Sequence, residues 1–175
     1  MRPDIKVWNP ENPAQWNKTL AWTTVWLSTF SLTLGFCAWF LVPSLAPRLN
    51  EIGFSLTHSQ LYWLVAMVGL SAGTLRILWT FLPPILGTRI LVTLSTGLLL
   101  IPLFCWVYAA QHPDTPYWML ICFALLSGIG GGTFSGLMAS TNYFFPKHER
   151  GLALGIQGGL SDFGTGLVQF VTPLV

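Results

Sequence analysis

The chain has 175 residues, of which 53% are hydrophobic and only 8% are charged, and its formal net charge at pH 7 is +2. Soluble domains are usually about 25% charged, so the composition argues against a soluble enzyme, and its high hydrophobicity excludes a disordered chain. The charge is also too small and too scattered for a nucleic-acid-binding surface. The composition indicates an all-α membrane protein with several spans.

We expect residues 1–19, which are polar and contain three prolines, to form a cytoplasmic N-terminal tail with Trp8 and Trp16 at the membrane interface. The rest of the chain, 20–175, contains apolar stretches of about 20 residues or more, long enough to cross a hydrocarbon core of about 30 Å as helices. These stretches lie at about 20–46, 60–85, 89–110, 116–145 and 151–175. We therefore predict about five transmembrane helices in one domain, with the Pro83–Pro84 pair ending the second.

The basic residues of the tail and connections predict the orientation. With the N-terminus in the cytoplasm, six of them are cytoplasmic and one is outside, which is a strong positive-inside bias. The six are Arg2, Lys6, Lys18, Arg89, Lys147 and Arg150, and the one outside is Arg48. We expect a multi-pass protein of the cell's inner membrane with a cytoplasmic N-terminus.

Two ionisable residues lie inside the predicted spans, where a charge is costly and usually marks a functional pathway. The small or polar residues Gly69, Gly73 and Thr80 share a helix face with Arg76. A planar guanidinium suits a small oxyanion, and a structural arginine paired with a carbonyl or carboxylate is the alternative. Asp162 lies about 16 Å and Arg76 about 12 Å from the cytoplasmic side, at about 1.5 Å per residue. They form either an ion pair or a site with a protonatable carboxylate.

Glycines recur every four residues in the last two predicted spans. Such patterns let membrane helices approach closely, so we predict that these glycines pack against other helices. They are Gly128, Gly132 and Gly136 in the fourth span and Gly151, Gly155 and Gly159 in the fifth. Phe134 is either core filler or an aromatic wall for a planar ligand. The three histidines lie in loops and are far apart, so we expect no metal site. No Ser/His/Asp set is credible, so we expect no enzymatic activity.

The run SGIGGGTFSGLMASTNYFFPKHERGLALGIQGGLSDFG resembles the signature region of the nitrate/nitrite porters (NarK type) of the major facilitator superfamily. The runs LYWLVAMVGLSAGTLRI and PYWMLICFALLSG resemble the second and fourth helices of the same family, so the resemblance extends from about residue 20 to the end. It implies a fold of twelve helices in two halves with the substrate between them. This chain then supplies an incomplete N-terminal half.

The resemblance implies transport of nitrate and/or nitrite by alternating access, with a missing C-terminal half as partner and no cofactor. It implies that Arg76 binds the anion, that Phe134 stacks on it and that Gly158 lies beside it. Asp162 stands where the family usually has a neutral asparagine, and an ionised carboxylate there would repel nitrate. Because the chain stops at Val175, the alternative is a truncated, non-transporting membrane protein or a remnant of such a transporter.

Overall fold

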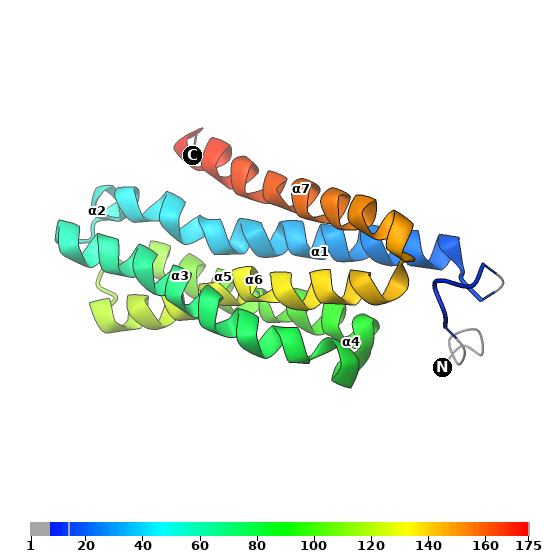
Figure 1. Cartoon of the computed structure of the whole chain (residues 1–175). Coiled ribbons are helices and arrows are strands. Elements are labelled where there is room, and N and C mark those ends of the chain that lie inside the picture. The colour runs from blue at the N-terminus through cyan, green and yellow to red at the C-terminus, as the bar shows by residue number, and fades with distance from the viewer. Residues whose placement is uncertain (1–7, 14, 175) are drawn as a thin grey trace.

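The computed structural model of the chain describes residues 8–13 and 15–174, so Arg2 and Lys6 lie outside the described residues (Figure 1). The long helices are α1 (Lys18–Leu45), α3 (His58–Phe81), α4 (Pro83–Leu98), α5 (Leu100–Gln111), α6 (Tyr117–Phe144) and α7 (Lys147–Val171). The short helices are η2 (Ala46–Arg48), α2 (Leu49–Ile52) and η3 (Thr172–Leu174). All regular structure in the described part of the chain is helical, as predicted.

Four segments of the described chain are long and apolar enough to cross a membrane, and the protein is a multi-pass membrane protein. These segments are Lys18–Ile52, His58–Phe81, Pro83–Gln111 and Tyr117–Phe144. The fifth predicted span, α7, has 25 residues, which at about 1.5 Å per residue is also long enough. Its many glycines and polar residues make it less apolar than the other four, so length alone supports this span.

The second predicted span ends earlier than its apolar stretch. Helix α3 stops at Phe81, and Pro83 opens α4, where a missing backbone N–H costs nothing. The prediction that this proline pair ends a helix is confirmed. Gly87 then interrupts α4 with φ of 75°, a conformation that favours glycine. The third span is therefore longer than 89–110, because α4 and α5 together form one apolar segment.

Helix α6 lies at the centre of the bundle and packs most extensively against α3. A Cβ atom added to Gly128 would lie 2.6 Å from the backbone nitrogen of Ala72. One added to Gly132 would lie 2.6 Å from Leu75 Cβ, and one on Gly136 would meet a backbone oxygen of α3 at 2.8 Å. All three glycines lie against α3 with no room for a side chain.

The predicted packing of Gly151, Gly155 and Gly159 is not found. Apart from the backbone of α7 itself, no atom of the described chain lies within 4 Å of a Cβ built on any of them. Helix α7 instead lies along α1 (Figure 1), where Gly164 contacts the carbonyl oxygen of Thr33. The glycine spacing identifies a helix face made of small residues, but it does not identify which helix packs on that face. Within the described chain, this face of α7 is uncovered.

Beside the N-terminus of α1, residues 8–13 and 15–18 form a segment that we call the clasp, because it closes over the turn between α6 and α7. Trp8 Nε1 donates to the carbonyl of Tyr143 at 3.2 Å, and Trp16 Nε1 donates to that of Phe144 at 2.9 Å. The last carbonyls of a helix have no partner within the helix, so the two indoles satisfy groups that the helix itself leaves open. The sequence predicted an interfacial role for both tryptophans but not these partners.

Charged groups complete the clasp. The Lys147 backbone N–H, at the start of α7, donates to Glu11 Oε1 at 3.0 Å. Lys18 Nζ forms an ion pair with Glu149 Oε1 at 2.9 Å. The clasp thus joins the start of α1 to the α6–α7 turn.

Trp16→Phe is expected to lower the free energy of unfolding by about 1 kcal/mol, because it keeps an aromatic ring but removes the donor to the Phe144 carbonyl. The measurement is thermal unfolding of the detergent-purified protein followed by helical circular dichroism. Trp118→Phe is the control, since that side chain is 66% exposed and a change there should leave the transition in place. Equal transitions for both variants would show that the hydrogen bond contributes nothing.

Candidate functional site

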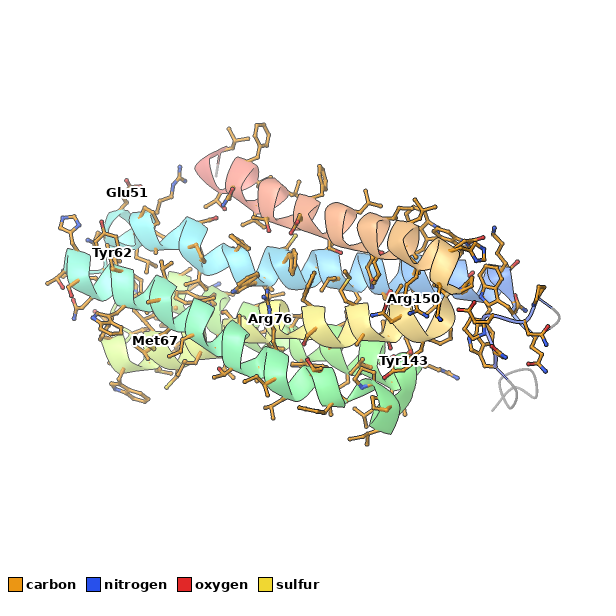
Figure 2. All side chains as sticks on the ribbon, viewed as in Figure 1. Glu51, Tyr62, Met67, Arg76, Tyr143 and Arg150 are labelled. Atoms are coloured by element: carbon orange, nitrogen blue, oxygen red, sulfur yellow. The ribbon has the colours of Figure 1, made fainter. Side chains whose placement is uncertain are left out.

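A cavity of about 400 Å³ lies among α1, α3, α6 and α7. All four predicted substrate residues line it, namely Arg76 from α3, Phe134 from α6, and Gly158 and Asp162 from α7. Figure 2 shows Arg76 roughly midway along the bundle, between Glu51 at one end and Arg150 at the other. Residues from three helices, which belong to two of the runs that carry the resemblance, therefore meet in one place.

The guanidinium of Arg76 is held by uncharged partners. Its Nε donates to the carbonyl oxygen of Gly131 at 3.2 Å. Its central carbon lies 5.3 Å from the ring centre of Phe134 and 5.5 Å from that of Trp39, within the range of cation–π attraction. Within the described chain, its two terminal nitrogens make no hydrogen bond. Those donors, and the positive charge, remain available to a ligand.

The glycines of α6 position this arginine. A Cβ on Gly131 would lie 2.6 Å from Trp39 Cδ2, so the absence of a side chain lets the indole reach the guanidinium. Ser135 Oγ donates to the Arg76 carbonyl at 2.7 Å, which ties α6 to α3 at the same level. Phe36 stacks on Phe134, with ring centres 5.8 Å apart and 22° between the planes. The packing that joins the helices also builds the aromatic wall.

Asp162 faces the cavity without a partner of its own. No ion pair within 4 Å and no hydrogen bond joins its carboxylate to the described part of the chain. Of the two arrangements that the sequence left open for Arg76 and Asp162, the structure shows a shared cavity and no ion pair.

A buried glutamine, which the sequence analysis did not single out, anchors α7 beside the cavity. Gln157 is fully buried, and its Nε2 donates to Ser28 Oγ of α1 at 2.9 Å. Its Oε1 accepts a hydrogen bond from Thr141 Oγ1 of α6 at 2.7 Å. Hydrogen bonds of this kind between membrane helices contribute about 0.6 kcal/mol each on average. They fix the part of α7 that carries Gly158 and Asp162.

Sequence reasoning missed four residues that line the cavity, namely Phe36, Trp39, Phe40 and Thr165. Gly166, which also lines it, lies four residues after Asp162 on the same helix face. A signal for the three aromatic residues exists, because positions i, i+3 and i+4 share one helix face. The run FCAWF has aromatic residues at these positions, in a chain where aromatic residues are so frequent that the pattern does not stand out. The described residues contain no group of three or more His, Cys, Asp or Glu that could hold a metal ion.

The sequence of this chain is similar to those of known proteins. The sequence profile of the Major Facilitator Superfamily matches residues 10–175. The chain is 60% identical over 171 residues to a probable nitrate/nitrite antiporter, NarK2, of Thermus thermophilus, covering 98% of this chain and 39% of that protein. It is 41% identical over 174 residues to the nitrate/nitrite transporter NarU of Escherichia coli, covering 98% of this chain and 38% of that protein.

A more distant relative is a probable nitrate transporter, NarT, of Staphylococcus aureus. It is 32% identical over 147 residues, which cover 84% of this chain and 36% of the relative. The chain thus spans about two fifths of the length of the curated relatives that it matches.

Proposed function

This chain belongs to the Major Facilitator Superfamily, and from that premise we propose that it is the N-terminal part of a transporter that carries nitrate and nitrite across the inner membrane. The observation that carries the proposal is the Arg76 guanidinium, whose two terminal nitrogens make no hydrogen bond within the described chain, in a cavity walled by aromatic rings. A guanidinium offers parallel N–H donors to a planar oxyanion, and such charge-assisted pairs are among the stronger hydrogen bonds.

In this proposal the terminal nitrogens of Arg76 bind two oxygens of the anion, and Phe134 presents its ring to the flat face of the anion. Gly158 leaves space beside the anion, since only Met138 Cε, at 3.7 Å, lies near the position of its missing Cβ. A tetrahedral anion such as sulfate cannot lie flat against a ring, so the same site favours planar anions.

The remaining part of the transporter is proposed to cover the open glycine faces. Gly69 and Gly73 of α3, like the uncovered glycines of α7, have no atom within 4 Å of an added Cβ. Faces of small residues let membrane helices pack closely. A partner on these faces would close the cavity. This chain and the partner would then be the two bodies that rock against each other around a central substrate site during alternating access.

The charge distribution supports a cytoplasmic N-terminus. Lys18 pairs with Glu149 in the clasp, so the basic residues near the α1 start and the α6–α7 turn gather at one end of the bundle. Arg150 lies at that end and Glu51, close to Arg48 in the chain, lies at the other (Figure 2). An excess of basic residues on one side marks the cytoplasmic side.

The test is uptake of isotope-labelled nitrate and nitrite into vesicles from cells that express the whole reading frame encoding this chain. We expect uptake above that of vesicles without the protein, with each anion competing for the other and sulfate competing with neither. Uptake equal to the background for both anions would reject the proposal and favour a non-transporting remnant.

A further inference from the structure

Trp39 of α1 lines the cavity and lies against its arginine. The central carbon of the Arg76 guanidinium lies 5.5 Å from the centre of the indole ring. Two other contacts of the guanidinium come from α6, namely the Phe134 ring at 5.3 Å and the carbonyl oxygen of Gly131 at 3.2 Å. Trp39 therefore adds a contact from α1 to the two that α6 supplies.

The contacts of this indole use its ring. Within the described chain, Trp39 Nε1 donates no hydrogen bond, whereas the indole nitrogens of Trp16 and Trp106 each donate one. The ring itself has close neighbours on the same helix. Phe40 meets it edge to face with ring centres 4.9 Å apart, and the ring centre of Phe36 lies 5.6 Å away. The aromatic ring is thus the part of this residue that the described chain uses.

The backbone of α6 leaves room for the indole. A Cβ on Gly131 would lie 2.6 Å from Trp39 Cδ2 and 2.7 Å from its Cε2, and one on Gly130 would lie 3.2 Å from Trp39 Cβ. A side chain at Gly131 would therefore displace the ring from its place beside Arg76. Core packing alone would also explain this recess, so the case for a further role depends on the charge that the ring faces.

An aromatic partner suits a ligand-binding arginine better than a carboxylate does. A carboxylate would occupy N–H donors and neutralise the positive charge, and an anion needs both. A ring attracts the cation through its quadrupole and takes no donor from the hydrogen-bonding groups. In agreement, the terminal nitrogens of Arg76 make no hydrogen bond within the described chain. A side chain that is ordered before the ligand arrives also loses less conformational entropy on binding.

We propose that Trp39 is a positioning residue of the anion site, whose ring holds the Arg76 guanidinium with both terminal nitrogens directed to the anion. Trp39 acts through Arg76 and need not touch the anion itself. The inference rests on the proposed function. Every group that it invokes belongs to this chain, so it requires no residue from the remaining part of the transporter.

The experiment is calorimetric titration of sodium nitrate into the detergent-purified protein that the whole reading frame encodes. Trp39→Leu removes the ring and is expected to weaken nitrate binding about twofold to tenfold, the usual cost of ordering one long side chain on binding. Trp39→Phe keeps a ring and should retain most of the affinity. Trp63→Leu is the matched control, because that tryptophan of α3 is 55% exposed and does not line the cavity, and it should bind as the unmodified protein does.

A double-mutant cycle with Arg76→Lys separates positioning from core packing. Lysine has no paired donors to orient, so Trp39→Leu should weaken nitrate binding less in the Arg76→Lys background than in the unmodified protein. A ring that only fills the core would cause the same fold-loss in both backgrounds, since the effects of independent sites add.

Tryptophan emission gives a readout that does not depend on affinity. An anion bound at Arg76 changes the charge beside the Trp39 ring. At saturating nitrate we therefore expect a change in the emission of the unmodified protein that is lost in Trp39→Phe.

The possible outcomes distinguish this inference from the proposed function. Equal affinities of Trp39→Leu and Trp63→Leu, equal losses from Trp39→Leu and Trp39→Phe, or additive losses in the cycle would overturn the positioning role while nitrate binding stands. If Trp39→Leu does not fold, an emission change that persists in Trp39→Phe would overturn it. Absence of nitrate binding by the unmodified protein would instead reject the proposed function.

Discussion

Arg76→Lys is expected to weaken nitrate and nitrite binding about tenfold to a hundredfold and to reduce uptake accordingly. Lysine keeps the positive charge but loses the paired donors of the guanidinium, and a hydrogen bond to a charged group contributes about 1.5–3 kcal/mol. Arginine donates from Nε to the Gly131 carbonyl while its terminal nitrogens stay free for the anion, whereas lysine has a single ammonium group for both tasks. Calorimetric titration of the purified protein measures the loss.

Arg89→Lys is the matched control for this prediction. Arg89 lies in α4, is exposed and does not line the cavity, so the same chemical change should leave the affinity unaltered. If Arg76→Lys bound nitrate as tightly as the Arg89 variant, the guanidinium would be a structural group that is held by its backbone and aromatic contacts. Groups other than the paired guanidinium donors would then bind the anion.

Gly132→Leu is expected to destabilise the bundle by about 3 kcal/mol and to lower the folded yield in detergent sharply. The first added carbon would lie 2.6 Å from Leu75 Cβ, which is fixed to the α3 backbone, so α3 and α6 must separate. Overpacking of this kind costs about 1–3 kcal/mol or more. The yield of monodisperse protein and its thermal transition are the two measurements.

Gly155→Leu makes the same change on the open face of α7, where no described atom lies within 4 Å. In this chain purified by itself, it should leave the yield unchanged, or raise stability slightly because leucine favours helix over glycine by about 0.5–1 kcal/mol. Equal losses from the two substitutions would mean that glycine is needed in both helices for a reason other than contact between α3 and α6.

The helical membrane fold and the four residues at the cavity were predictable from the sequence. Long apolar stretches fix the class, because backbone groups in lipid must be satisfied within helices. Arg76 and Asp162 stand out because charges are rare in such stretches, and the family resemblance adds Phe134 and Gly158. Rarity of a residue type is a signal that a single sequence can carry.

Partners across helices were not predictable in the same way. The glycine spacings of α6 and α7 look alike in the sequence, yet Gly132 is enclosed by α3 and Gly155 is uncovered. Gln157 joins three helices through its amide, but in the sequence it is one polar residue in a glycine-rich run. Periodicity describes one helix at a time, whereas these properties depend on how helices meet.

The clasp has a consequence for the order of events during synthesis. Its two indole contacts join residues separated by 135 and 128 positions, and its Glu11 contact spans 136. None of these contacts can form until the ribosome has produced the turn that follows the fourth apolar segment. Residues of the clasp are thus made long before their partners and form these contacts late. The clasp can therefore close only after α6 and the start of α7 have been synthesised.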